Sequence, residues 1–401
     1  MKVVIVGNGL AGTLAAKTLR ELDRDVEIEV IGEERFPYYP RPNLIEYLAG
    51  RLPYEKLFAF PEGWADRQRI GLRLGEKVTK IRPAERQIET ASGSSRAYDA
   101  LLLATGARAA LPPIGGTAKK GVFVLRTLDD AQELIEHLGG HKRVAVLGGG
   151  LLGLEIARAI RGREAEVGVF EFFDRLLPRQ LDPAAAAILK AQLEKSGVSV
   201  RLGAVTKEVL GNGGVRGLRF ETGGDVGADC VIVAAGIKPE WGPGRDAGLA
   251  VGRGIVVDDR MRTSAPGIFA AGDAAEHRGR IYGIIPAAFE QARVAAYNIL
   301  GQEMPYGGTM PSNTLKVAGI HVTSVGEIDA AGHGFESFVR SDPEAGLYKK
   351  IVLQEGRLVG AIWMGTKRGA AEVSRLVALR KDVETRKENL LEDEFDFSEI
   401  T

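Results

Sequence analysis

The stretch VVIVGNGLAGTLA occupies residues 3–15, and the similar stretch RVAVLGGGLLGLE occupies residues 143–155. Each begins with a short run of apolar, mostly β-branched residues, continues through the pattern G-x-G-x-x-G, and ends in a segment rich in alanine or leucine. This order predicts a strand, a tight turn and a helix. The chain therefore contains nearly the same local device twice.

The three glycines of each pattern have separate physical roles. The first permits the sharp turn after the strand, the second lets the backbone approach a diphosphate, and the third lets the helix pack closely on the strand. The start of the helix then offers free N–H groups and the positive end of its dipole to the diphosphate. The predicted dinucleotide contacts are Gly7, Gly9, Leu10, Ala11 and Gly12 in the first pattern and Gly148, Gly150, Leu151, Leu152 and Gly153 in the second.

An acidic residue follows each pattern at the expected distance. A carboxylate about 20 residues beyond the glycines can accept hydrogen bonds from the adenosine ribose. Glu33 and Glu34 follow the predicted strand VEIEVIG, and Glu171 follows AEVGVF. The alternative is that these glutamates only begin solvated loops. A carboxylate at position 171 would repel a 2′-phosphate, which favours NADH over NADPH. The repeat therefore predicts that the chain binds two different dinucleotides, such as one with a flavin and one with a nicotinamide.

Length, composition and charge are those of an ordinary globular protein. The chain has 401 residues, of which 45% are hydrophobic and 26% charged, and its 53 basic and 53 acidic residues cancel. This balance gives no reason to expect nucleic acid or an anionic membrane as a partner. No apolar run approaches the roughly 18 residues of a membrane span, and we expect no signal peptide before the first strand. We therefore expect a cytoplasmic protein.

Cysteine and histidine usage argues against thiol and metal chemistry. The one cysteine, Cys230, lies in the apolar run DCVIVAAG, which is typical of a buried strand rather than a redox thiol. His137 and His141 have the spacing of a helical zinc pair, but Gly139 and Gly140 between them are expected to end the helix. We predict no iron–sulfur, haem or zinc site within the chain.

Five motifs together resemble one family. In chain order they are G-x-G-x-x-G, ATG, G-x-G-x-x-G-x-E, AAG-x-x-P and FAAGD, and they extend over about residues 1–305. This order resembles that of the FAD-dependent pyridine nucleotide oxidoreductases of glutathione-reductase type. The resemblance implies an α/β fold with two Rossmann-like domains and a C-terminal α+β interface domain. The implied bounds are 1–112 and 243–306 for the FAD-binding domain, 113–242 for the NADH-binding domain and 307–401 for the interface domain.

The resemblance also implies further cofactor contacts. The aspartate of the second FAD motif would hold the ribityl chain, and a backbone position before the ATG motif would meet the adenine. Amides at the start of a later helix could stabilise negative charge on the reduced flavin. The residues concerned are Val78, Ala104, Thr105, Gly106, Gly236, Gly272, Asp273, Pro286, Ala287 and Ala288.

The stretch PYYPRPNLIEYLAG at residues 37–50 indicates the subgroup. Relatives that reduce disulfides or peroxide carry a cysteine there, whereas this chain has Arg41, Pro42 and Asn43. The arrangement is similar to that of NADH:rubredoxin oxidoreductases, ferredoxin reductases of oxygenase systems and the flavin segment of siroheme nitrite reductases. The later stretch PSNTLKVAGIHVTSVGEID, residues 311–329, is similar to the rubredoxin and nitrite reductase branch.

One position departs from the family pattern. Relatives often pair a lysine near the flavin with the glutamate that matches Glu155, and Glu46 stands at the lysine position here. Either the pair is lost or another cation, such as Lys316, replaces it. We predict that Glu155 orients the nicotinamide; the alternative is an ordinary carboxylate near a helix start.

The predicted reaction is hydride transfer from NADH to FAD, followed by single-electron transfer to a small acidic acceptor such as rubredoxin. The alternatives are the flavin part of a nitrite reductase, an NADH oxidase that uses oxygen, and a regulatory NADH-binding flavoprotein. For docking of an acidic acceptor, the candidate basic patch is Lys367, Arg368, Arg375, Arg380 and Lys381; its alternative is a solvated helix face. The acidic residues from 388 to 399 are expected to form a frayed, solvated tail.

Overall fold

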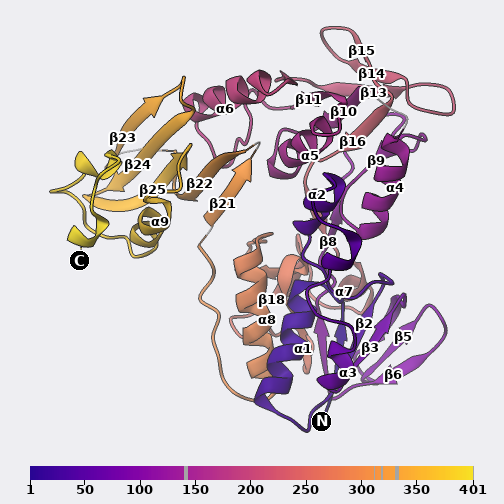
Figure 1. Cartoon of the computed structure of the whole chain (residues 1–401). Helices are drawn as coiled ribbons and strands as arrows, with labels where there is room; N and C mark the ends of the chain where they lie inside the picture. The colour runs from indigo at the N-terminus through magenta and orange to yellow at the C-terminus, as the bar shows by residue number, and fades with distance from the viewer. Residues whose placement is uncertain (140–142, 311, 318, 330–333, 401) are drawn as a thin grey trace. The chain divides into compact units, whose positions relative to one another are not determined.

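A computed structural model describes residues 1–139, 143–310, 312–317, 319–329 and 334–400, with the backbone alone for residues 312–317 and 399. The chain divides into two compact units (Figure 1). Unit 1 contains Met1–Ala110 and Ile237–Thr309, and unit 2 contains Leu111–Gly236 and Met310–Thr401. An inserted segment thus interrupts the first unit, and the C-terminal residues join the insert. The three-domain bounds that the resemblance implies stay a prediction.

Unit 1 is built on a parallel sheet of the doubly wound type. Its strand order is β19-β7-β1-β2-β3, and helices α1 and α8 lie side by side against it (Figure 1). The elements are β1 (Lys2–Val6), α1 (Leu10–Leu22), β2 (Glu27–Gly32), β3 (Ile70–Leu74), β7 (Ala100–Leu103), β19 (Ile268–Ala270) and α8 (Ile285–Ile299).

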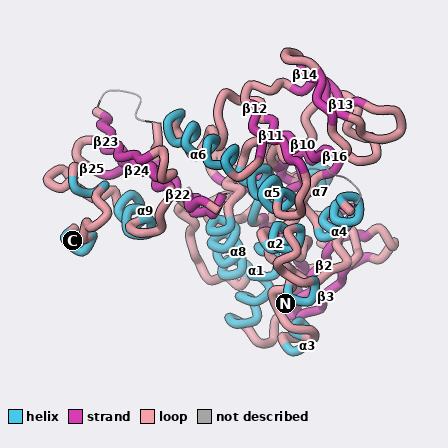
Figure 2. Tube along the Cα trace, turned by 45° about the horizontal axis from the view of Figure 1, so that its top comes forward, coloured by secondary structure: helices cyan, strands magenta, loops and turns pink. Residues whose placement is uncertain are grey.

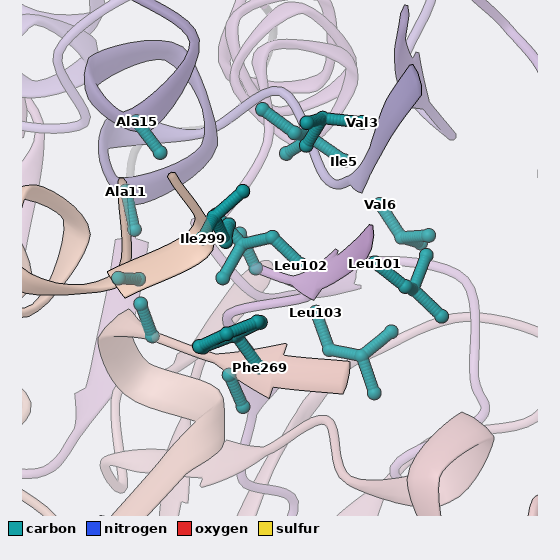
Figure 3. Packing of buried hydrophobic residues seen from close by; sticks show 14 of the residues in the cluster. Val3, Ile5, Val6, Ala11, Ala15, Leu101, Leu102, Leu103, Phe269 and Ile299 are labelled. Carbon is teal, nitrogen blue, oxygen red and sulfur yellow. The ribbon is translucent and has the colours of Figure 1, made fainter. Parts of the chain in front are cut away.

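The core of unit 1 follows from the apolar runs in these strands. Val3, Ile5 and Leu101 are fully buried, as expected where helices and loops cover both faces of a parallel sheet. Figure 3 shows Ala11 and Ala15 of α1 beside this layer, where their small side chains permit close packing of the helix. Close packing therefore holds the carboxyl end of β1, the central strand that leads into the glycine turn.

Smaller elements complete unit 1. Three antiparallel strands form one sheet in the order β4-β5-β6, and two further strand pairs are β8 with β17 and β18 with β20. The elements are α2 (Asn43–Leu48), η1 (Tyr54–Lys56), α3 (Trp64–Arg67), β4 (Val78–Arg82), β5 (Gln87–Thr90), β6 (Ser95–Ala97), β8 (Ala107–Ala109), β17 (Ile237–Pro239), α7 (Gly242–Asp246), β18 (Ile255–Val257), η2 (Gly272–Ala274) and β20 (Ala275–His277).

The inserted part of unit 2 repeats the design of unit 1. Its parallel sheet has the order β12-β11-β10-β16-β9, and a three-stranded antiparallel sheet, β13-β14-β15, is added. The elements are β9 (Val122–Phe123), α4 (Leu128–Leu138), β10 (Arg143–Leu147), α5 (Leu151–Arg161), β11 (Glu166–Phe170), α6 (Pro183–Lys195), β12 (Val198–Arg201), β13 (Thr206–Leu210), β14 (Gly217–Phe220), β15 (Asp225–Gly227) and β16 (Cys230–Val233). Helix α4 ends at Leu138, before Gly139, as the sequence predicts; His141 lies outside the described residues.

The C-terminal part of unit 2 is an antiparallel sheet in the order β21-β22-β25-β24-β23. Helix α9 packs against β25 and β22. The elements are β21 (Ser312–Val317), β22 (Ile320–Gly326), β23 (Phe335–Asp342), β24 (Leu347–Gln354), β25 (Arg357–Met364), α9 (Ala370–Ala378), η3 (Asn389–Leu391) and η4 (Phe397–Glu399).

The C-terminal tail is not frayed, and that expectation was wrong. Leu390, Leu391 and Ile400 are buried in the core of the C-terminal sheet. Phe397 packs its ring edge-on to Trp363, with the ring centres 6.5 Å apart. The apolar residues between the acids hold the tail on the sheet by burying apolar area, while the described acids of the tail remain exposed to water. Within the described part of the chain, no helix is long and apolar enough to cross a bilayer.

Candidate functional site

The first glycine turn has the geometry that a diphosphate requires. Gly7 has a φ of +114°, and a Cβ there would overlap the carbonyl of Ala104. A Cβ on Gly12 would overlap the carbonyl of Gly7, so only glycine lets the helix pack this closely against the end of the strand. By contrast, a Cβ on Gly9 would have no described heavy atom within 4 Å. The open space lies where the second glycine is expected to face a phosphate.

Helix α1 leaves its first N–H groups for a ligand. It begins at Leu10, its N-cap is Gly9, and among the described residues no side chain caps it. Its first turn contains no acidic residue. The positive end of the helix dipole therefore faces the open space beside Gly9.

The second turn reproduces the first. Gly148 has a φ of +118°, a Cβ on Gly153 would overlap the Gly148 carbonyl, and Gly150 again faces space empty of described atoms within 4 Å. Helix α5 begins at Leu151 with Gly150 as its N-cap and no acidic residue in its first turn. Leu152, which follows, is 38% exposed. Both turns thus have the shape predicted from the sequence.

The two glutamates after β2 have different surroundings. Glu34 accepts hydrogen bonds from Tyr39 and Arg41, and Arg41 also donates to the Tyr39 hydroxyl at 2.6 Å. Glu33 pairs with Lys77 at 2.8 Å, and its side chain is 68% exposed. Glu33 is therefore the carboxylate that remains accessible for a ribose, whereas Glu34 organises the loop that leads to Arg41.

Glu171 is tied to the second glycine turn. Its side chain accepts hydrogen bonds from the N–H groups of Gly149 and Phe173, the latter at 2.8 Å, and the residue is only 5% exposed. Phe172 and Phe173 beside it are 61% and 53% exposed. The carboxylate thus stabilises the shape of the turn as well as standing at the end of β11.

Loops after the central strands of unit 1 complete the first site. Thr105 donates its hydroxyl proton to the Glu240 carbonyl at 2.6 Å, and the Glu240 N–H donates to the Gly106 carbonyl at 2.8 Å. Ala104 is buried at the end of β7. These bonds join the ATG loop to the returning chain just after β17. The buried residue Val78 begins β4, and Gly236, at the end of the insert in unit 2, has a φ of +101°.

The second FAD motif lies between two helices. Gly272, with a φ of +80°, lies against α1, because a Cβ there would be 3.0 Å from that of Ala11. Its N–H donates to the side chain of Gln291 on α8 at 2.9 Å. Asp273 follows in η2 and is partly exposed. Sequence reasoning missed Gln291; the signal was a glutamine on the alanine-rich, buried face of a predicted helix.

The predicted amides at the start of α8 require a correction. Pro286 has no N–H, and the N–H of Ala288 already donates to the Ile284 carbonyl at 3.2 Å. Of the three predicted residues, Ala287 is therefore the one whose amide belongs to the first turn and is not used in this way. Among the described residues no side chain caps this helix. The positive end of the α8 dipole is therefore not neutralised by a capping side chain of the described residues.

Glu46 and Glu155, the two glutamates at the positions of the family's lysine–glutamate pair, each lie beside an arginine. Glu46 on α2, which follows Pro42, forms a two-point ion pair with Arg51 at 2.6 and 2.8 Å. Glu155 on α5 lies 3.3 Å from the Arg158 guanidinium. Lys316 belongs to β21, and its side chain lies outside the described residues. Whether Lys316 acts in the site stays a prediction.

The two sites fit the two dinucleotides predicted for them. Unit 1 combines an open second glycine, an uncapped helix start, the accessible Glu33 and the Gly272–Asp273 turn. These are the groups that would hold the diphosphate, ribose and ribityl chain of FAD. Unit 2 combines the second open glycine with an uncapped helix start, which suit the diphosphate of NADH. Glu171 stands at the end of β11, and its two oxygens accept hydrogen bonds from backbone N–H groups of the turn and the following loop.

Comparison with known families agrees with this arrangement. The family described as pyridine nucleotide-disulphide oxidoreductase matches residues 1–292, and the family described as rubredoxin NAD+ reductase C-terminal domain matches residues 311–381. The chain belongs to the pyridine nucleotide-disulphide oxidoreductase family. The family resemblance and the α/β fold class inferred from the sequence are confirmed.

Curated relatives of the family fall into two groups by length. The nitrite reductase [NAD(P)H] of Bacillus subtilis is 36% identical over 98% of this chain but only 49% of its own length. The chain thus spans about half the length of such relatives. The ferredoxin–NAD(+) reductase component of the biphenyl dioxygenase system of Paraburkholderia xenovorans is 35% identical over 95% of this chain and 94% of that protein. The rubredoxin-NAD(+) reductase of Pseudomonas putida is 36% identical over 76% and 81%, respectively.

Solved structures of the family are similar over nearly the whole chain. The NADH:rubredoxin oxidoreductase of Clostridium acetobutylicum gives a TM-score of 0.82 at 28% identity and covers 96% of this chain and 97% of that one. The reductase in the covalent putidaredoxin reductase–putidaredoxin complex gives 0.88 at 29% identity, with coverages of 100% and 97%.

Proposed function

We propose that this chain is an NADH-dependent flavoprotein oxidoreductase that passes electrons one at a time to a small acidic redox protein of the rubredoxin type. The observation that carries the proposal is the pair of open glycine turns in a chain whose single cysteine is buried. Burial in β16, together with the charge of Asp229, raises the pKa of the Cys230 thiol to about 12. A thiol relay of the disulfide reductases is therefore unavailable, and the electrons must leave by another route.

Residues of the chain position the cofactors and exclude water. FAD, when bound, would supply the redox chemistry that links a two-electron donor to a one-electron acceptor. The N–H groups at the start of α1 bind its diphosphate, Glu33 binds its ribose, and Asp273 holds its ribityl chain. The Ala287 amide would stabilise negative charge on its pyrimidine ring, and the backbone of Val78 would bind its adenine.

In the second site, the start of α5 binds the NADH diphosphate and Glu171 favours the 2′-hydroxyl over a 2′-phosphate. Glu155 orients the nicotinamide. These groups act by positioning the reactants. A hydride carries its hydrogen and both electrons together, so the transfer requires no proton from a protein side chain. We place the reaction in the cytoplasm, where NADH is regenerated.

A second candidate function is the flavin segment of a nitrite reductase. It is supported by the 36% identity to the Bacillus subtilis enzyme over nearly this whole chain. In that case the acceptor is a metal centre of the same complex rather than a diffusing protein.

Anaerobic titration of the purified chain with NADH tests the proposal. We expect a yellow protein whose flavin absorbance bleaches with one equivalent of NADH, and rapid turnover only when a rubredoxin or ferredoxin is added. Fast turnover with oxygen alone would indicate an oxidase. A stable charge-transfer absorbance without turnover would indicate a regulatory flavoprotein.

A further inference from the structure

Helix α6 begins at a buried carboxylate that also contacts the C-terminal sheet. Asp182 is the N-cap of this helix and accepts a hydrogen bond from the Ala185 N–H at 3.0 Å. Its other oxygen accepts from the Tyr348 hydroxyl at 2.6 Å and from Lys350 Nζ at 3.0 Å. Asp182, Tyr348 and Lys350 are 7%, 2% and 8% exposed. Figure 2 shows α6 beside β24, which carries both partners.

The same carboxylate is connected to the second glycine turn through a short buried segment. The Leu181 N–H donates to the Leu177 carbonyl at 2.9 Å, and the Leu177 N–H donates to the Gly149 carbonyl at 3.1 Å. Leu176, Leu177 and Leu181 are completely buried. The N–H of Gly149 donates to Glu171, so residues 171–182 hold the middle residue of the turn from both sides.

Packing leaves this segment little freedom. A Cβ on Gly149 would lie 2.5 Å from the Leu176 side chain and 3.0 Å from a Glu171 oxygen. Close-packed interiors transmit a displacement rather than absorb it. A shift of Asp182 at the start of α6 therefore changes the position of Gly149, which lies between the two glycines of the dinucleotide turn.

We propose that Lys350 and Tyr348 are positioning residues for the second dinucleotide site. Acting through Asp182 and residues 171–182, they hold the glycine turn in the shape that binds the diphosphate of NADH. The C-terminal sheet thereby sets the affinity for the nicotinamide dinucleotide. This inference rests on the proposed function, because it takes the turn at Gly148–Gly153 to be the NADH site.

The physical reason is the state of Asp182 when a partner is lost. A buried carboxylate without its cation is strongly destabilised, so it either takes up a proton or moves toward water. Movement toward water withdraws the first turn of α6 and, through Leu181 and Leu177, the Leu177 N–H group that donates to the Gly149 carbonyl of the glycine turn. Coupling of this kind between separated positions is on the order of 0.5–2 kcal/mol, which corresponds to roughly two- to thirtyfold in affinity.

Lys349 provides a matched control on the same strand. Its ammonium lies on the opposite face of the sheet, where it donates to the Leu391 carbonyl at 3.0 Å and to Asp393 at 2.6 Å, and the residue is 1% exposed. Successive residues of a strand face opposite sides. Lys349→Met therefore removes an equally buried cation from β24 without touching α6.

The test uses ADP-ribose, which carries the adenosine and diphosphate of NADH but cannot reduce a flavin. Its dissociation constant is measured by titration calorimetry for the full chain and for Lys350→Met, Tyr348→Phe and Lys349→Met. We expect at least about a threefold weakening for Lys350→Met, a smaller weakening for Tyr348→Phe, and no change for Lys349→Met. Hydrogen exchange of the Leu177 amide without ligand is expected to accelerate in the first two variants alone.

The outcomes separate the two proposals. If the unaltered chain does not bind ADP-ribose, the proposed function is wrong. If it binds but Lys350→Met and Tyr348→Phe bind equally well with unchanged Leu177 exchange, the positioning role is wrong. Equal weakening in Lys349→Met would also overturn it, because the effect would then reflect general loss of stability. Tyr348→Phe removes only a hydroxyl and decides the question if Lys350→Met does not fold.

Discussion

Arg368 and Glu394 form a two-point ion pair in which the guanidinium nitrogens lie 2.9 and 2.8 Å from the carboxylate oxygens. The acidic tail thus neutralises part of the basic patch that was proposed for docking an acidic acceptor. Arg380 of the same patch donates to the Gln354 side chain at 2.9 Å. Lys367 and Arg375 are exposed and remain the better candidates for long-range attraction.

Charge reversal at Lys367 and Arg375 tests the docking role. The double change to glutamate is expected to slow reduction of an acidic rubredoxin, because it removes the attraction between the two proteins. It is also expected to flatten the dependence of that rate on ionic strength, because salt slows the reaction only by screening this attraction, within about 10 Å at 0.1 M salt. Turnover with ferricyanide is expected to stay the same. Stopped-flow rates across a salt series measure both. Lys207→Glu with Arg216→Glu, on the β13–β14 hairpin, changes the net charge equally; a similar effect there would remove the patch from the model.

Single alanine substitutions at Gly150 and Gly153 of the second turn are expected to have different effects. One should weaken ligand binding, and the other should lower stability. A Cβ on Gly153 would overlap the Gly148 carbonyl, so Gly153→Ala is expected to lower the thermal midpoint of unit 2. Gly150 faces open space and its φ of −80° suits any residue, so Gly150→Ala is expected to keep the midpoint. It should instead weaken NADH binding by at least about tenfold, since the methyl group occupies the diphosphate position. Thermal unfolding and titration calorimetry distinguish the two effects, and an unimpaired affinity in Gly150→Ala would contradict the assignment.

Cys230 is expected to be chemically inert. With its thiol pKa raised to about 12 by burial and by Asp229, almost no thiolate exists at neutral pH. Iodoacetamide at about pH 8 should label the native chain far more slowly than the urea-unfolded chain. Cys230→Ala should leave NADH-dependent acceptor reduction nearly unchanged, with a loss of about 1 kcal/mol in the free energy of unfolding. Loss of turnover in a folded Cys230→Ala variant would refute a mechanism without thiols.

NADH is expected to reduce the flavin well ahead of NADPH, as judged by kcat/KM. Glu171 stands at the end of β11, and the nearby Arg175 lies 3.3 Å from the Asp174 carboxylate, which weakens its attraction for a 2′-phosphate. Glu171→Ala should weaken NADH binding by about 1–3 kcal/mol. Because Glu171 also binds the Gly149 N–H, part of this loss reflects the shape of the turn, so ADP-ribose binding should weaken as well. Equal or better kcat/KM with NADPH would refute the role given to the carboxylate.

The stability of unit 2 is expected to depend on pH through Asp182. Burial would raise the pKa of this carboxyl, but hydrogen bonds from Tyr348, the Ala185 N–H and Lys350 outweigh it and hold the pKa below its ordinary value of 3.8. A carboxylate with a depressed pKa contributes stability above its unfolded-state pKa and loses it as the pH falls through its folded-state pKa. Asp182→Asn, which still caps a helix, should therefore be less stable at about pH 7, with the difference shrinking below about pH 4. Urea midpoints across this range measure it; a difference independent of pH would contradict the assignment.

The single cysteine already excludes a thiol relay within this chain, and the family resemblance implies the fold class. The sequence by itself also determined the two strand–turn–helix segments. These follow from short-range rules: Gly7 and Gly148 need a positive φ, Gly12 and Gly153 need close packing, and both kinds of constraint act within fifteen residues. The end of helix α4 at Leu138, just before Gly139, likewise follows from residues that are adjacent in the sequence.

Only the tertiary structure decided which charged groups meet. Arg368 pairs with Glu394, 26 positions along the chain, and Asp182 pairs with Lys350, 168 positions along the chain. The tail that we expected to be frayed is held in place because the apolar residues between its acids pack into the C-terminal core. The local sequence pattern does not indicate where that core lies. Charge and hydrophobic contacts depend on distance in space, which a periodic pattern along the chain does not encode.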